Sequence, residues 1–287
     1  MNHKLIFLDI DGTLTEPGSN TPPPSALEAV RRARAAGHRV FLCSGRNRGM
    51  LSALLRLGFD GAVCSAGGHI ECGGRIVYDC PMTPEQQTRV LTAFRRAGVF
   101  RTAECLDSAY TDEGLKDFLL ERAGENSELL RWRRHVESDL NIRPMAEYRD
   151  QPIYKVVFMA REAEDLRTPR ELLEEEFQFC LQEPDRFGIV NGELINRKFH
   201  KGSAVRRLCA YLNVPLEDTV AFGDSMNDLE MIETAALGVC MGNGSEALKK
   251  AAGAVCPPQS EDGLYRAFAR IGLLDGASGS PGDAAEI

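Results

Sequence analysis

The sequence has no long hydrophobic segment, although hydrophobic residues make up 43% of its 287 residues. No apolar run reaches the ~18–20 residues that a membrane-spanning helix needs. The first apolar run, Leu5–Leu8, is too short for the core of a secretion signal, and acidic residues follow it at once. We therefore expect a soluble protein without a targeting segment.

The sequence also lacks paired cysteines and an excess of positive charge. None of its nine cysteines belongs to a Cys-x-x-Cys pair, and several lie in apolar runs, where free cysteine behaves as a small hydrophobic residue. This pattern argues against a disulfide framework or a zinc site and favours the reducing cytoplasm. The net charge of −8 argues against binding of nucleic acid or of an anionic membrane. An anionic substrate would therefore need a local cationic group.

Short apolar runs, each ending in small or acidic residues, alternate with helical patterns along much of the chain. The runs are Leu5–Leu8, Val40–Cys43, Ala62–Cys64, Val220–Phe222, Gly238–Met241 and Ala254–Cys256. The clearest helical patterns are Ser25–Ala36, Gly202–Leu212 and Leu229–Ala236. Apolar strands that alternate with helices indicate a parallel sheet covered on both faces, which is an α/β, Rossmann-like fold.

This alternation is interrupted at residues 83–192. Helical patterns there are mixed with alternating strand patterns such as Ile153–Phe158 and Phe177–Leu181. We therefore expect a catalytic core formed by residues 1–82 and 193–274, with residues 83–192 inserted as an α+β cap domain. The final segment, residues 275–287, has little apolar surface to bury and is predicted to be disordered.

Two aspartates, Asp9 and Asp11, directly follow the first apolar run. Residues i and i+2 of an extended chain point to the same side, so the two carboxylates converge and need a cation or a shared proton. Magnesium fits, because it binds one or two carboxylates together with waters and phosphate oxygens. An isolated Asp-x-Asp pair is, however, more often an acidic junction between a strand and a loop.

Three further motifs place polar residues after other apolar runs or at a helix start. They are Ser44-Gly45-Arg46, Lys201-Gly202-Ser203, and Asp224 with Asn227 and Asp228. Taken singly, each has a simpler explanation: a flexible loop, a surface charge, or helix capping by Asn227 or Asp228. Ligands of an open α/β sheet bind outside the carboxyl ends of its strands, and main-chain N–H groups there can hold phosphate oxygens. Together, the four motifs predict a site for a phosphoryl group and magnesium.

The order of these motifs also resembles a known family. Asp-Ile-Asp-Gly-Thr (9–13), Cys-Ser-Gly-Arg (43–46), Lys-Gly (201–202) and Gly-Asp-Ser-Met-Asn-Asp (223–228) occur in the order typical of the haloacid dehalogenase (HAD) superfamily of aspartate-nucleophile phosphohydrolases. The insert resembles the type IIB cap of Cof-like sugar-phosphate phosphatases. The resemblance covers about Lys4–Leu274. It departs from the family where Ser65-Ala66-Gly67-Gly68 replaces the usual Asn-Gly-Ala, and where Ser44 replaces a threonine.

The resemblance implies a mechanism. Asp9 would attack phosphorus and form an aspartyl-phosphate, while Asp11 would protonate the leaving oxygen and then activate water. Lys201 would assist by binding the transferring phosphoryl group. The cap domain would close over the substrate and select the leaving group.

The resemblance also implies which residues bind the substrate and the cofactor. The predicted substrate-binding residues are Ser44, Gly45, Arg46, Lys201 and Asn227. The predicted cofactor is Mg²⁺, and its predicted ligands are Asp9, the backbone carbonyl of Asp11 and Asp224. Asp228 would be a further ligand or would hydrogen-bond the ligands. The expected partner is a small phosphorylated metabolite, and the expected assembly is a monomer or weak homodimer.

Two alternatives to a phosphatase stay open. A phosphomutase of the phosphomannomutase type would pass the phosphoryl group to a second sugar position, and its activity would depend on a bisphosphate. A non-catalytic regulator would be phosphorylated on an aspartate and read by a partner. The regulator is disfavoured because Asp11 is present to hydrolyse the intermediate and because the insert is large.

Overall fold

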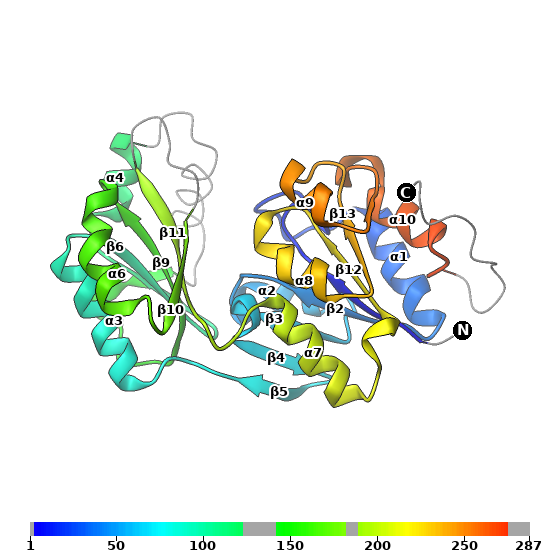
Figure 1. Cartoon of the computed structure of the whole chain (residues 1–287), viewed down its shortest axis with the longest axis horizontal. Helices are drawn as coiled ribbons and strands as arrows, with labels where there is room; N and C mark the ends of the chain where they lie inside the picture. Colours follow the sequence, from blue (N-terminus) through cyan, green and yellow to red (C-terminus); the bar gives the residue numbers. More distant parts are fainter. Residues whose placement is uncertain (1–2, 123–141, 182–188, 275–287) are drawn as a thin grey trace. The chain divides into compact units, whose positions relative to one another are not determined.

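The computed structural model describes residues 3–122, 142–181 and 189–274 (Figure 1). The chain divides into two compact units, one formed by residues 1–79 and 199–287 and the other by residues 80–198. The boundaries predicted from the sequence lie three and six residues away, after residues 82 and 192. The second boundary moves because strand β11 (Val190–Asn196), which belongs to the sheet of the second unit, runs through it. The predicted disordered tail, residues 275–287, lies outside the described residues.

The first unit is built on an eight-stranded sheet. Its strands are, in spatial order, β14 (Ala254–Val255), β13 (Leu237–Cys240), β12 (Thr219–Gly223), β1 (Leu5–Leu8), β2 (Arg39–Cys43), β3 (Gly61–Cys64), β4 (His69–Cys72) and β5 (Arg75–Asp79). The first six run parallel and match the six apolar runs to within one residue at each end, which confirms the predicted α/β core. The antiparallel hairpin β4–β5 was not predicted, because Glu71 interrupts the apolar pattern of β4 and charged residues stand at both ends of β5.

Helices cover both faces of this sheet (Figure 1). One face packs against α1 (Pro24–Ala35), α2 (Arg48–Leu55) and α10 (Gly263–Arg270), and the other against α7 (Lys201–Leu212), α8 (Leu229–Thr234) and α9 (Glu246–Ala251). Ile6 and Leu8 of β1 point into the first layer, whereas Leu5 and Phe7 point into the second. Burial on both faces explains why these strands have continuous apolar sequences.

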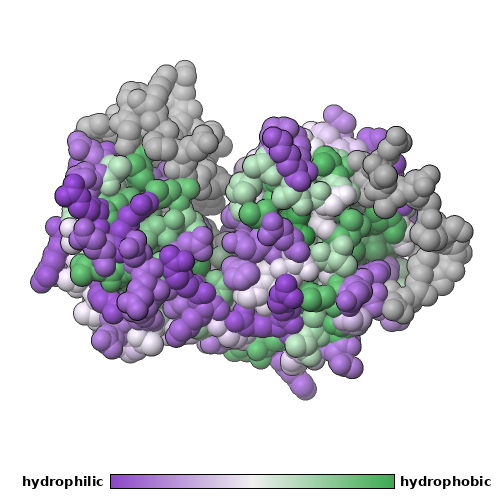
Figure 2. Space-filling model, in the orientation of Figure 1, coloured by the Kyte–Doolittle hydropathy of each residue, from purple (hydrophilic) through white to green (hydrophobic). Residues whose placement is uncertain are grey.

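The second unit has a six-stranded, largely antiparallel sheet. Its strands are, in spatial order, β10 (Phe177–Leu181), β11, β9 (Ile153–Ala160), β6 (Phe100–Cys105), β7 (Ala109–Thr111) and β8 (Ile142–Pro144). Helices α3 (Pro84–Arg96) and α6 (Arg167–Leu173) pack on one face, and α4 (Leu115–Arg122) packs on the other. Figure 2 shows that the side on which α3 and α6 lie is largely hydrophilic, as expected for helices that bury only one face. This unit is the predicted α+β insert.

No helix in the described ranges combines the length and the hydropathy that crossing a bilayer requires.

Candidate active site

The polar motifs meet at one edge of the first unit's sheet. Asp9 follows β1, Ser44 follows β2 and Asp224 follows β12, and these three strands are neighbours. Lys201 is the first residue of α7. The carboxyl ends of adjacent parallel strands thus bring together residues that are more than 200 positions apart in the sequence.

Lys201 lies at the centre of the site. Its Nζ donates hydrogen bonds to Asp9 Oδ1 at 2.7 Å and to Asp228 Oδ1 at 2.5 Å, and it lies 3.5 Å from Asn227 Oδ1. All three charged residues are buried. Burial alone would lower the pKa of Lys201, but the carboxylates of Asp228 and Asp9 outweigh it and hold that pKa well above its ordinary value. Lys201 is therefore a permanent, buried cation.

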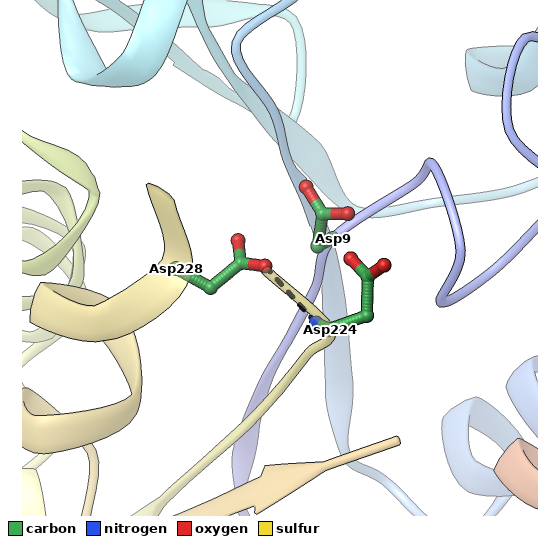
Figure 3. A group of neighbouring side chains, drawn as sticks. All are labelled: Asp9, Asp224 and Asp228. Carbon is green, nitrogen blue, oxygen red and sulfur yellow. Dashed lines mark hydrogen bonds between the residues drawn. The ribbon is translucent and has the colours of Figure 1, made fainter. Parts of the chain in front are cut away.

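Three carboxylates lie close together (Figure 3), and two of them, Asp9 and Asp228, accept hydrogen bonds from Lys201. Asp9, Asp224 and Asp228 each offer an oxygen, and these oxygens lie within 4.8 Å of one another. Within the described part of the chain, Asp224 Oδ1 is buried and has no hydrogen-bond partner. Clustered carboxylate oxygens with an unsatisfied ligand atom are the donor set that a hard divalent cation such as Mg²⁺ prefers. The residues present therefore fit a metal ion.

The electrostatics of the trio lead to the same conclusion. Burial, reinforced by the charge of Asp228, raises the pKa of Asp224 to about 7. Burial and the same neighbour hold the pKa of Asp9 well above its usual range. Among the described residues, Lys201 is the cation that opposes these three acids, so the fully ionised cluster carries excess negative charge. A divalent cation would neutralise that excess.

Asp228 also shapes the loop that carries Asp224. Its Oδ2 accepts hydrogen bonds from the main-chain N–H groups of Asp224, at 3.1 Å, and Ser225, at 3.2 Å; Figure 3 shows the first. Oδ2 of Asp228 therefore caps the turn before α8, as the sequence suggested, while Oδ1 accepts the hydrogen bond from Lys201. Asn227 is held by Ser225, whose hydroxyl donates to Asn227 Oδ1 at 2.8 Å.

The carboxylate of Asp11 lies with Arg46. Arg46 donates from Nε to Asp11 Oδ2 at 2.9 Å and from a terminal nitrogen to Oδ1 at 2.7 Å. Oδ1 also accepts from the main-chain N–H of Gly18 at 2.6 Å. Arg46 continues to Asn20 Oδ1 at 2.6 Å and to the Ser19 carbonyl at 3.1 Å. The structure thus pairs Arg46 with Asp11 through two hydrogen bonds. The predicted contact of Arg46 with the substrate stays a prediction.

The loop after β2 places the predicted phosphate-binding hydroxyl. Ser44 is buried, and its Oγ accepts a hydrogen bond from the main-chain N–H of Arg46 at 3.2 Å, across Gly45. Asn47 caps α2 by accepting from the N–H of Met50 at 3.0 Å. A short hydroxyl-bearing loop that leads into a capped helix is suited to holding an anion.

Two further contacts support the site, and sequence reasoning missed the first of them, which involves Asn243. The amide of Asn243 donates to the Gly12 carbonyl at 2.8 Å, which ties the loop after β13 to the loop after β1. Gly12 has φ +82°, and a Cβ on it would lie 2.2 Å from Asp224 Oδ2. Only glycine permits that turn and that close approach. The sequence pattern that could have pointed to Asn243 is Gly-Asn-Gly at residues 242–244, but this pattern by itself predicts only a glycine-rich turn.

Comparisons with known proteins extend this picture. Residues 6–268 match the model of a family described as haloacid dehalogenase-like hydrolase. The chain is 29% identical to phosphatase YwpJ of Bacillus subtilis, over 91% of this chain and 97% of that protein. It is also 29% identical to a phosphoglycolate phosphatase of Metallosphaera sedula, over 87% of this chain and 90% of that protein.

A solved structure shares the fold. The HAD subclass IIB sugar phosphatase BT4131 is 22% identical and matches with a TM-score of 0.72, covering 94% of this chain and 99% of its own. The matching family model spans most of the chain, and both of these relatives are named as phosphatases. The chain therefore belongs to the haloacid dehalogenase-like hydrolase family and is a phosphatase.

Proposed function

We propose that this phosphatase hydrolyses a small phosphomonoester through an aspartyl-phosphate on Asp9, with Mg²⁺ as its cofactor. The observation that carries the proposal is the buried contact of Lys201 with Asp9, beside the carboxylates of Asp224 and Asp228. A carboxylate can approach a phosphate dianion only if the repulsion between them is cancelled. Lys201 supplies one positive charge, and Mg²⁺, when bound, supplies the remainder.

Mg²⁺ would be held by the three clustered carboxylates and, as the family resemblance implies, by the backbone carbonyl of Asp11. Ser44 would donate its hydroxyl to an oxygen of the phosphoryl group that Lys201 also contacts. Asn227, held by Ser225, would orient Lys201 or a phosphate oxygen. These groups would stabilise the charge that spreads over the phosphoryl oxygens in the transition state.

In the first step, Asp9 would attack phosphorus, so that an O–P bond forms while the bond to the leaving oxygen breaks. The hydrogen bond from Lys201 to Oδ1 would hold the Asp9 carboxylate in place for the attack. The leaving oxygen takes a proton from Asp11. In the second step, water attacks the aspartyl-phosphate and gives its proton to Asp11, which releases phosphate and restores Asp9.

The ion pair between Asp11 and Arg46 bears on both steps. The two hydrogen bonds from Arg46 fit the carboxylate form of Asp11, which is the form that would accept a proton in the second step. The first step needs the protonated form, so the pair must loosen when the substrate binds. Arg46 would then act by placing Asp11 and not by holding the phosphate.

Replacement of Arg46 by alanine tests this role. We expect kcat to fall about 10–100-fold with little change in KM, because Asp11 loses the group that orients it. Arg46→Lys should not restore activity, since an ammonium cannot form the two parallel hydrogen bonds. Arg34→Ala is a matched control, because Arg34 makes a similar two-point contact with Asp60 away from the site. A rise in KM as large as the fall in kcat would instead assign Arg46 to the substrate.

The proposed substrate class is sugar phosphates. The subclass IIB relative of known structure is a sugar phosphatase, whereas the relative from M. sedula is named for phosphoglycolate. Release of inorganic phosphate should therefore be measured on a panel of hexose and pentose phosphates, phosphoglycolate and other small phosphomonoesters, with Mg²⁺ or with EDTA. We expect Mg²⁺-dependent turnover that is fastest on a sugar phosphate. Faster turnover of phosphoglycolate would contradict the substrate class, and equal turnover in EDTA would contradict the metal.

A further inference from the structure

The turn after β3 holds two successive non-glycine residues in the left-handed conformation. Ser65 has φ +49° and Ala66 has φ +57°, and Gly67 follows at +112°. In the rest of the described chain, the non-glycine residues with positive φ have acid or amide side chains that tolerate this region: Asp150, Asn213 and Asp262. Serine and alanine have no such preference. Their surroundings must therefore impose the conformation.

Main-chain hydrogen bonds tie this turn to the loop that carries Ser44. The N–H of Ser65 donates to the Arg46 carbonyl at 2.8 Å, and the N–H of Ala66 donates to the Ser44 carbonyl at 3.0 Å. The hydroxyl of Ser65, in contrast, is fully buried and has no hydrogen-bond partner among the described residues. The turn therefore contacts the Ser44 loop through its backbone.

The other side of the turn packs against the start of α7. A Cβ on Gly67 would lie 2.8 Å from the His200 carbonyl oxygen, and one on Gly68 would lie 2.8 Å from the ring of Phe199. His200 directly precedes Lys201 and is the N-cap of α7. The turn thus lies between the two segments that carry Ser44 and Lys201, with no room for a side chain on the α7 side.

We infer that the Ser65–Gly68 turn is a positioning element that sets the distance between Ser44 and Lys201. The inference rests on the proposed function, in which these two residues bind the same phosphoryl group. Transition-state stabilisation is sensitive to such placement, since a shift of about 1 Å can lower a rate about 100-fold. A backbone held in a disfavoured conformation by contacts on both sides is a rigid spacer, and strain of this kind is concentrated at functional sites.

Two substitutions test the turn. Gly67→Ala pushes a methyl group against the His200 carbonyl, and we expect kcat/KM to fall about 10–100-fold. Ala66→Gly cannot clash and relieves the left-handed strain, so its Tm should not fall, yet the freed backbone should lower kcat/KM by roughly 3–10-fold. Vanadate mimics the trigonal-bipyramidal transition state of phosphoryl transfer. In both variants its inhibition constant should rise in proportion to the fall in kcat/KM, whereas that of inorganic phosphate should change less than about threefold.

Gly73→Ala is the matched control. Gly73 has φ +54° in the β4–β5 hairpin, and a Cβ on it would meet no atom within 4 Å, so the variant carries the strain without the clash. It should keep wild-type kinetics. The turn is purely structural, and the inference wrong, if folded Gly67→Ala and Ala66→Gly both keep the wild-type kcat and the wild-type ratio of the vanadate and phosphate inhibition constants.

Ser44→Ala and Lys201→Ala should be assayed in parallel. A large loss of activity in both supports the assignment on which the inference rests. Unchanged activity would show that the proposed roles of Ser44 and Lys201 have failed, and the inference falls with them. If Ser44→Ala and Lys201→Ala lose activity but the turn variants do not, the inference about the turn is wrong while the proposed function stands. The two failures are therefore distinguishable.

Discussion

Asp9→Asn is expected to abolish turnover while the protein stays folded. An amide cannot attack phosphorus, and loss of a catalytic nucleophile lowers kcat by about 10⁴–10⁶-fold. Lys201 contacts both Asp9 and Asp228, but both oxygens of Asp228 are already engaged, one by Lys201 and the other by the main-chain N–H groups of Asp224 and Ser225. Phosphate release under saturating substrate and Mg²⁺ measures the effect directly.

The same substitution should leave the metal-free protein at least as stable as the wild type. The pKa of Asp9 is raised, first by burial and then by Asp228, so the folded state favours the neutral acid. At neutral pH the ionised carboxylate therefore destabilises the fold, and an amide resembles the neutral form. Lys201 keeps its contact with Asp228. We expect the Tm of Asp9→Asn in EDTA to equal or exceed that of the wild type.

Mass spectrometry of rapidly quenched enzyme checks the covalent intermediate. A phosphoryl group should appear on the peptide that contains Asp9 and be absent from Asp9→Asn. Asp60→Asn is a suitable control, because Asp60 pairs with Arg34 away from the site and its loss should leave turnover in the folded protein unchanged. Activity of Asp9→Asn within about tenfold of the wild type would contradict the role of Asp9 as nucleophile.

The sequence was most informative where burial dictates residue type. The six parallel strands were predicted because each is covered on both faces, which demands unbroken apolar runs such as Leu5–Leu8 and Val40–Cys43. Strand β5 was missed because none of its five residues is buried and its ends, Arg75 and Asp79, are charged and exposed. An exposed edge strand places few demands on its sequence.

The site was predictable in part for the same geometric reason. Asp9 and Asp224 meet because the carboxyl ends of β1 and β12 are neighbours, which follows from an α/β fold with motifs after its strands. The pairing of Asp11 with Arg46 was not predictable, because it depends on a loop that brings Gly18 and Ser19 back to the site. No local pattern specifies that return.

The left-handed turn at Ser65 and Ala66 was hidden for a related reason. Glycine or asparagine would have marked such a turn, but serine and alanine do not favour positive φ. The sequence showed only that these residues depart from the family pattern. The conformation comes from tertiary contacts with Ser44, Arg46 and His200, which a one-dimensional pattern does not contain.

Mg²⁺ is expected to stabilise the protein much more at pH 8 than at pH 5.5. In the metal-free protein, burial and the charge of Asp228 raise the pKa of Asp224 from 3.8 to about 7. A carboxyl group with a raised pKa in the folded state stabilises the fold when it is protonated. This stabilisation is complete at pH values below the pKa of the unfolded state and is lost as the pH rises through about 7. The shift corresponds to at most roughly 4 kcal/mol of stability lost between about pH 4 and pH 8.

A bound divalent cation reverses this loss, because it binds the ionised carboxylates of the folded state only. At about 100 times its dissociation constant it would add roughly 2.7 kcal/mol at pH 8. Below pH 7 the proton on Asp224 must leave before the metal binds, so the apparent affinity should fall about tenfold for each further pH unit. The Tm should therefore be measured with Mg²⁺ and with EDTA at pH 5.5, 7 and 8, alongside turnover, which EDTA should abolish.

Asp224→Asn separates this site from any other cation site. The variant should lose both the stabilisation by Mg²⁺ and most of the pH dependence of the metal-free protein, because the amide neither titrates nor binds the metal as strongly as a carboxylate. Asp112→Asn, in the second unit, should keep both, since Asp112 pairs with Arg101 and belongs to no carboxylate cluster found among the described residues. A Tm increase with Mg²⁺ that is equal at all three pH values, or that survives in Asp224→Asn, would place the metal elsewhere. Apart from Lys201, the excess negative charge of Asp9, Asp224 and Asp228 would then have to be reduced by protonation.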